Sequence, residues 1–174
     1  FMLDIAMKKT IPTIAFVGRS GSGKTTLIEK LTDHFASRGL RVGVIKHLRH
    51  EFDIDHPGKD TFRFRAAGAA VVSISNESFL AIIAQNPRRL APQEAAAELF
   101  EACDILFVEG NKEKNYNKIE VIGEQNETPL YQSGIEGIVA LVSDKKIEAG
   151  IPVFPRDDIE SIARFIESFL RISA

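Results

Sequence analysis

The chain has 174 residues, enough for one domain with a full hydrophobic core. Its 22 Lys and Arg residues nearly balance its 24 Asp and Glu residues, and this net charge of −2 argues against a nucleic-acid partner. No apolar run approaches the ~20 residues of a membrane-spanning helix, so we expect no membrane partner. The single cysteine, Cys103, cannot form an internal disulfide, which fits a reducing, cytoplasmic location.

Residues 1–11 are interpreted as an N-terminal extension. They lack the charged start, apolar stretch and small-residue cleavage site that follow one another in a secretory signal. Because the first residue is Phe, we expect residues 1–6 to be partly a remnant of expression. Residues 12–174 are predicted to form a single domain.

Residues 18–25, called the P-loop below, have the spacing G-x-x-x-x-G-K-[ST] between an apolar run and a helical pattern. Such a loop wraps a triphosphate with backbone N–H groups, so glycine is needed where φ is positive or the backbone closely approaches oxygen. Lys24 would reach the outer phosphates, and the Thr25 hydroxyl would ligate Mg²⁺. The helix that begins at Lys24 adds its dipole to the anion site. The predicted nucleotide contacts are Gly18, Arg19, Ser20, Gly21, Ser22, Gly23, Lys24, Thr25 and Thr26.

A polar stretch follows the strand predicted at residues 42–46, and it is too long for a plain connection. Its three histidines and two aspartates could bind a transition metal, but the basic residues among them would oppose a cation. We therefore favour recognition of an anionic second ligand, with a metal site and a merely solvated loop as alternatives. The residues assigned to this second-ligand loop are Lys46, His47, His50, Asp53, Asp55, Lys59, Arg63 and Arg65.

A buried run at residues 105–108 ends directly at Glu109. A P-loop needs an acidic group at a neighbouring strand end, which holds Mg²⁺ directly or through water. We assign Glu109 to this role and, beside Lys24, to catalysis; the alternative is an exposed carboxylate with no ligand. Thr25 and Asp60 complete the predicted metal site.

Base selection in a GTPase usually needs a strand-end Asp that accepts two hydrogens from guanine. The run Asn111-Lys-Glu-Lys114 begins like the signature Asn-Lys-x-Asp but ends in Lys, so it fails. Asp144 follows the strand predicted at residues 138–142 and is better placed. A helix-capping or turn role for Asp144 is the alternative.

Taken in order, the apolar patterns alternate between strands and helices. Strands are predicted at residues 12–17, 42–46, 70–75, 79–84, 105–108, 118–122, 138–142 and 152–154. Helices are predicted at residues 24–38, 58–67 and 93–102, and after a cap at Asp157 or Asp158. We consider an antiparallel direction for residues 118–122 and a mobile loop at residues 123–136. The pattern predicts an α/β, three-layer P-loop NTPase fold, with a mostly parallel sheet, helices on both faces and some antiparallel strands.

Besides the P-loop, two stretches carry a family resemblance. One includes Lys46-His-Leu-Arg-His50 and Pro57-Gly-Lys-Asp60, and the other includes Asp104-Ile-Leu-Phe-Val-Glu-Gly110 and Lys118-Ile-Glu-Val121. Together they resemble the molybdopterin-guanine dinucleotide biosynthesis protein B (MobB) family over nearly all of residues 12–170. The resemblance adds Lys112 to the second-ligand loop, whereas Asn111 departs from the aromatic residue expected before it.

The resemblance implies a GTP-binding, weakly hydrolysing accessory protein of molybdenum-cofactor maturation, with GTP and Mg²⁺ as cofactors and a homodimeric state. Its implied partners are molybdopterin or its guanine dinucleotide, and the guanylyltransferase that attaches GMP to molybdopterin. The residues alone support a Mg²⁺–nucleotide site beside a loop for an anionic ligand. Two alternatives stay open: a small-molecule kinase, with Arg88 and Arg89 as its basic lid, and a nucleotide-dependent metallochaperone or scaffold, which the histidines support.

Overall fold

The computed structural model describes residues 11–48, 54–84, 100, 102–124 and 128–172. The chain divides into two compact units: a larger one, formed by residues 1–47 and 96–174, and a smaller one, formed by residues 48–95. The expected single domain over residues 12–174 stays a prediction. Within the described ranges, no helix is both long enough and apolar enough to cross a lipid bilayer.

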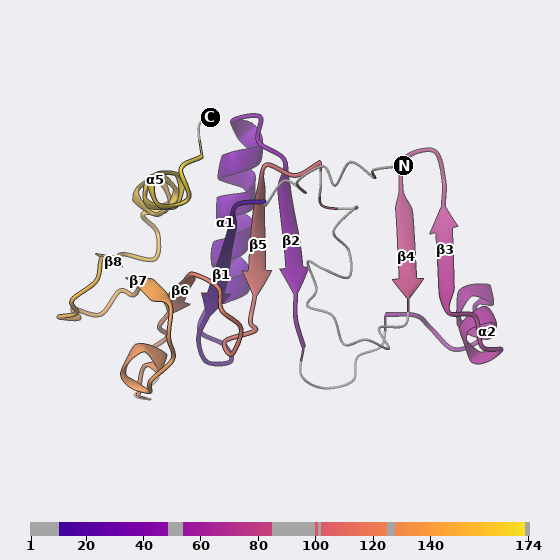
Figure 1. The fold of residues 1–174 in the computed structure, drawn as a ribbon, viewed down its shortest axis with the longest axis horizontal. Helices are drawn as coiled ribbons and strands as arrows, with labels where there is room; N and C mark the ends of the chain where they lie inside the picture. Colours follow the sequence, from indigo (N-terminus) through magenta and orange to yellow (C-terminus); the bar gives the residue numbers. More distant parts are fainter. Residues whose placement is uncertain (1–10, 49–53, 85–99, 101, 125–127, 173–174) are drawn as a thin grey trace, which may run out of the picture. The chain divides into compact units, whose positions relative to one another are not determined.

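The larger unit is built on a six-stranded sheet with the strand order β2-β5-β1-β6-β7-β8 (Figure 1). Each neighbouring pair of strands in it is parallel. Its strands are β1 (Thr13–Val17), β2 (Val42–Lys46), β5 (Ile105–Glu109), β6 (Lys118–Val121), β7 (Ile138–Val142) and β8 (Val153–Phe154). Because all six run the same way, their carboxyl ends meet at one edge, where parallel sheets bind ligands.

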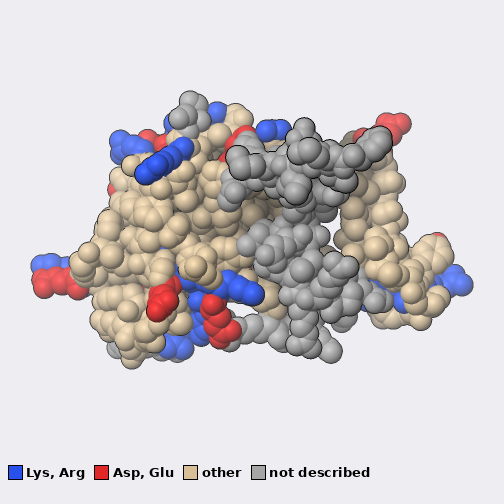
Figure 2. Space-filling view, viewed as in Figure 1, with Lys and Arg blue, Asp and Glu red and all other residues tan. Residues whose placement is uncertain are grey.

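Two helices, α1 (Lys24–Ser37) and α5 (Ile159–Leu170), pack on one face of this sheet. Side chains of a strand alternate between faces, so Phe16 lies in the core beneath the helices while Ala15 belongs to the core on the opposite face. Phe100 packs against that second core. Figure 2 shows side chains of both charges scattered over the visible face of this unit, as a net charge near zero predicts.

The smaller unit contains α2 (Asp60–Ala66) and an antiparallel hairpin of β3 (Val71–Ser75) and β4 (Leu80–Ala84). The Asn76 side chain closes the hairpin turn by accepting hydrogen bonds from the backbone N–H groups of Ser78 and Phe79. Val72 is buried. Exposed large apolar side chains of the hairpin are Val71, Ile74, Phe79, Leu80 and Ile82.

The predicted fold class is confirmed: a mostly parallel sheet with helices, plus a small antiparallel sheet. The antiparallel direction considered for residues 118–122 is wrong, because β6 runs parallel to β1 and β7. The register of β5 and β6 against β1 explains why β6 is parallel. Glu109 pairs with Phe16 and Lys118 pairs with Ala15, so β6 begins near the level at which β5 ends. The chain therefore needs no return path along the sheet, and a short connection suffices.

The sequence predicts a mobile loop at residues 123–136, and the described part of this segment holds some secondary structure. It contains a short 3-10 helix, η1 (Leu130–Gln132). The buried carboxylate of Glu120 accepts hydrogen bonds from the backbone N–H groups of Leu130, at 2.6 Å, and Tyr131, at 2.9 Å. These two bonds fix the start of η1. The helix predicted at residues 93–102 lies mostly outside the described residues.

Candidate functional site

The P-loop joins β1 to α1 at the carboxyl edge of the sheet. Gly18, Gly21 and Gly23 have φ angles of 149°, 71° and 90°, in the region that favours glycine. A Cβ atom on Gly18 would also collide with the carbonyl oxygen of Val121. Gly23 caps α1 without a side-chain hydrogen bond, which leaves the helix N-terminus open to an anion.

The Lys24 side chain folds back over the P-loop. Its Nζ donates to the carbonyl oxygens of Gly18, at 3.1 Å, and Arg19, at 2.7 Å. Burial lowers the pKa of Lys24 below its ordinary value of 10.5; Glu109 opposes this shift and Lys46 adds to it. The predicted phosphate-binding ammonium therefore lies over the loop that would hold the phosphates.

Glu109 brings together the ends of three elements. The Thr25 hydroxyl, at the start of α1, lies 3.2 Å from Glu109 Oε1 and 3.3 Å from Oε2. Lys46, which pairs with Glu109 in the register of β2 and β5, places its Nζ 3.6 Å from Oε1. The Glu109 side chain is only 14% exposed. A hydroxyl and a carboxylate are oxygen ligands that Mg²⁺ accepts, so this pair fits the predicted metal site.

The third residue of the predicted metal site, Asp60, stays a prediction. Asp60 belongs to the smaller unit, at the start of α2, where its carboxylate lies 3.5 Å from Arg63 Nη1. Among the residues that the structure describes, no group of three or more His, Cys, Asp or Glu side chains could hold a metal ion. Mg²⁺ itself needs no such group, because it keeps several waters and binds one or two carboxylates together with substrate phosphates.

Asp144 is engaged by Arg156, a residue that sequence reasoning misses. The Arg156 backbone N–H donates to Asp144 Oδ1 at 3.0 Å, and its Nε lies 3.3 Å from Oδ2. The other two guanidinium nitrogens donate to the carbonyl oxygens of Ser22 and Ile122. The only sequence signal for Arg156 is its position, because it follows β8 at the same edge of the sheet as the P-loop.

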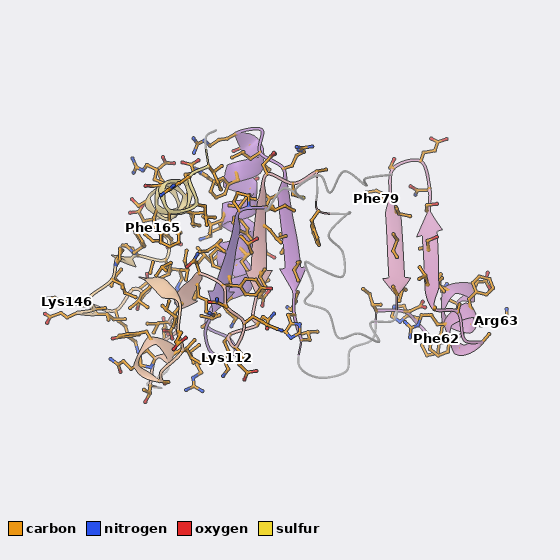
Figure 3. All side chains as sticks on the ribbon, viewed as in Figure 1. Phe62, Arg63, Phe79, Lys112, Lys146 and Phe165 are labelled. Carbon is orange, nitrogen blue, oxygen red and sulfur yellow. The ribbon has the colours of Figure 1, made fainter. Side chains whose placement is uncertain are left out.

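The second-ligand residues are distributed over both units. In the larger unit, Lys46 ends β2, His47 follows it, and Lys112 follows β5 (Figure 3). In the smaller unit, Asp55 accepts a hydrogen bond from Thr61 at 2.8 Å and lies 4.0 Å from Arg65. Arg63, labelled on α2 in Figure 3, is exposed, as is Lys59 before it. His50 and Asp53 lie outside the described residues, as do Arg88 and Arg89.

Asn111, which departs from the family pattern, has a φ angle of 58° directly after Gly110 at 89°. Asparagine tolerates this left-handed region better than most other side chains, including aromatic ones. The departure therefore suits the local backbone.

A hollow of about 380 Å³, including open solvent, lies beside the P-loop. Arg19, Gly21, Ser22, Glu120, Gly123 and Thr128 are among its lining residues. It lies over the carboxyl end of β6, and η1 is fixed next to it through Glu120. The P-loop thus has an open flank formed by residues of the larger unit alone.

Comparison with known proteins gives consistent results. A family model described as "Molybdopterin guanine dinucleotide synthesis protein B" matches residues 13–144. The "Molybdopterin-guanine dinucleotide biosynthesis adapter protein" of Escherichia coli (strain K12) is 32% identical over 174 residues, covering 96% of this chain and 98% of its own length. The protein of the same name from Haemophilus influenzae is 34% identical over 167 residues, covering 95% and 93%.

Solved structures agree with the sequence relatives. Bacillus subtilis MobB superposes with a TM-score of 0.71 at 28% identity, over 91% of this chain and 97% of the other. The fold, the P-loop and the family model therefore all indicate one assignment. This chain belongs to the molybdopterin guanine dinucleotide synthesis protein B (MobB) family.

Proposed function

We propose that this chain binds GTP with Mg²⁺, hydrolyses it slowly, and acts as a cytoplasmic adapter in the attachment of a guanine nucleotide to molybdopterin. The observation that carries the proposal is the contact of Thr25 with Glu109 beside a P-loop, in a chain of this family. The names of the relatives, biosynthesis adapter proteins for molybdopterin-guanine dinucleotide, support the biosynthetic role.

Each site residue has a distinct task in this proposal. Backbone N–H groups of the P-loop bind the phosphates, and Lys24 neutralises charge on the outer ones. Thr25 and Glu109 would hold Mg²⁺, which supplies further charge neutralisation when bound. Glu109 already contacts Thr25 and Lys46, and these contacts restrict the carboxylate from orienting an attacking water. That arrangement supports slow turnover.

The smaller unit is proposed to bind the second ligand. Lys59 caps the start of α2, and Arg63 and Arg65 lie in its last turn. An anion such as the molybdopterin phosphate would pair with these three cations. The hairpin of β3 and β4 supports a homodimer or contact with the guanylyltransferase. A two-stranded hairpin is marginally stable alone, and Figure 2 shows its visible face as mostly uncharged.

Two measurements test the proposal. Titration calorimetry with and without Mg²⁺ should detect GTP binding that Mg²⁺ strengthens. Immobilised GTP-loaded protein should then retain molybdopterin or its guanylyltransferase on a column. The double variant Lys59→Ala/Arg63→Ala should bind GTP normally and retain less molybdopterin. A matched control, Lys146→Ala/Arg164→Ala, removes two exposed cations of the larger unit and should behave like the wild type.

Other results would contradict the proposal. Stoichiometric transfer of the γ-phosphate to a small acceptor would instead indicate a kinase. Normal support of guanine-dinucleotide cofactor formation by the double variant would remove Lys59 and Arg63 from the second-ligand site.

A further inference from the structure

We propose that Arg156 is a positioning residue of the nucleotide site: it holds the Ser22–Gly23 peptide in its phosphate-binding orientation and links that peptide to Asp144. The inference rests on the proposed nucleotide binding. Arg156 lies between β8 and α5, far from the P-loop in sequence, and it belongs to neither predicted signature.

The Arg156 guanidinium ties three segments together. Nη1 donates to the Ser22 carbonyl in the P-loop, and Nη2 donates to the Ile122 carbonyl after β6 at 2.9 Å. Nε lies 3.3 Å from Asp144 Oδ2, after β7. The side chain is only 25% exposed. The planar guanidinium presents its donors in a fixed fork, so these three acceptors also fix one another's positions.

The bond to Ser22 determines which way the next N–H points. In a trans peptide the C=O and the following N–H point to opposite sides of the chain, and the described peptides are all trans. With the Ser22 carbonyl turned to Arg156, the Gly23 N–H is directed away from it. P-loops bind phosphate through such N–H groups. Arg156 therefore opposes rotation of this peptide out of the phosphate-binding orientation.

Gly23 is adapted to the same contact. A Cβ atom built on Gly23 would collide with Arg156 Nη1, and the φ angle of 90° also favours glycine. The glycine that precedes the P-loop lysine thus has two roles here. It allows the turn, and it leaves room for the guanidinium to reach the backbone.

The segment that carries Arg156 is itself fixed. Asp157 Oδ1 lies 2.7 Å from Lys30 Nζ on α1, and Asp158 caps α5 by accepting a hydrogen bond from the Ser161 N–H. Asp144 accepts from both the backbone N–H and the Nε of Arg156. The Asp144 side chain is 65% exposed and each oxygen keeps a further lone pair. A ligand group bound there would therefore be coupled to the P-loop through one arginine.

The test uses the full chain, GTP, and inorganic tripolyphosphate, which has neither base nor sugar. Arg156→Gln should weaken binding of both ligands by about tenfold or more, because charge-assisted bonds to the loop are lost. Arg156→Lys keeps one charged donor and should fall between. Arg164→Gln, the same change at an exposed position of α5, should leave both affinities unchanged. Thermal melting without ligand checks that each variant folds.

The outcomes separate this inference from the proposed function. If the wild type binds neither ligand, the nucleotide function fails and the inference fails with it. If the wild type binds and both Arg156 variants bind tripolyphosphate equally well, only the inference is overturned. Asp144→Ala provides a second variant: it should weaken tripolyphosphate binding by releasing Arg156, and an unchanged affinity would overturn the link to Asp144. Should Arg156→Gln fail to fold, Arg156→Lys and Asp144→Ala decide between these outcomes.

Discussion

The Thr25 hydroxyl lies 3.2 Å from Glu109 Oε1, so the start of α1 and the end of β5 bring two oxygen atoms side by side. Adjacent ligands of an octahedral Mg²⁺ site, each 2.0–2.1 Å from the metal, are about 2.9 Å apart. A closing movement of about 0.3 Å would therefore bring both oxygens into one coordination sphere. The Lys46 ammonium, 3.6 Å from the same oxygen, would have to yield part of its contact.

Glu109→Gln should weaken GTP binding in the presence of Mg²⁺ by about tenfold, because an amide oxygen is a poorer magnesium ligand than a carboxylate. With the metal removed by a chelator, the same variant should bind GTP within about twofold of the wild type. Thr25→Val should behave similarly. Titration calorimetry in both buffers measures the effect, and equal losses with and without Mg²⁺ would mean that these residues act in another way.

Lys24→Ala should weaken GTP binding more than about tenfold, because its ammonium would neutralise phosphate charge. The affinity should also depend on pH. In the free protein, burial lowers the pKa of Lys24 below its ordinary value of 10.5, and a bound triphosphate would raise this pKa again. The complex then holds more protons than the free protein, so GTP affinity should fall as pH rises through the lowered pKa.

Lys24→Arg supplies the control for this pH dependence. The guanidinium stays protonated at every accessible pH, while guanine ionisation affects wild type and variant alike. Fluorescence titration from neutral to alkaline pH should show a steeper loss of affinity for the wild type. Parallel curves would show that titration of Lys24 does not control binding.

Glu120→Ala should destabilise the protein by about 2 kcal/mol. The substitution leaves the N–H groups of Leu130 and Tyr131 without their charged acceptor. The Leu130 bond is buried and the Tyr131 bond is partly buried. Glu148→Ala, at an exposed position, should change the free energy of unfolding by less than about 0.5 kcal/mol. Urea unfolding compares the two. Equal midpoints would indicate that water replaces the carboxylate at η1.

The local features of the fold could be predicted because buried parallel strands read as continuous apolar runs. Ile105 to Val108 is such a run, and its end at Glu109 is visible in the sequence. The P-loop glycines could likewise be predicted, since their left-handed φ angles leave few other residues. The cap of α5 was narrowed to two aspartates, and the structure identifies Asp158.

Features that depend on distant contacts could not be predicted in the same way. The direction of β6 follows from its register beside β1, which no local pattern encodes. The turn at η1 depends on Glu120, ten residues earlier, and a strand-end carboxylate resembles any other in sequence. Arg156 stands 134 positions from the Ser22 carbonyl that it contacts. An isolated arginine after a short strand carries no signal of such a contact.

Asp144→Asn distinguishes two roles for this carboxylate. Guanine offers N1–H and an exocyclic N2–H₂ along one edge, and a carboxylate can accept from both. Xanthine has a carbonyl in place of the N2 amine, which an amide can satisfy and a carboxylate cannot. If Asp144 reads the base, the variant should therefore bind GTP more weakly and XTP more strongly than the wild type.

Weakening the contacts between Asp144 and Arg156 adds a second component to the change in affinity that Asp144→Asn causes. The backbone N–H and the Nε of Arg156 bind different oxygens of Asp144. In asparagine one of these two positions holds an NH₂ group, which cannot accept a hydrogen bond, so the P-loop should lose support. This component should weaken GTP, XTP and tripolyphosphate by the same factor, because it acts on phosphate binding. This common factor cancels in the ratio of GTP to XTP affinity, so that ratio isolates base recognition, while the tripolyphosphate affinity measures the loss of phosphate binding alone. A ratio that does not change would leave Asp144 as the anchor of Arg156 alone, and base selection would have to come from other residues.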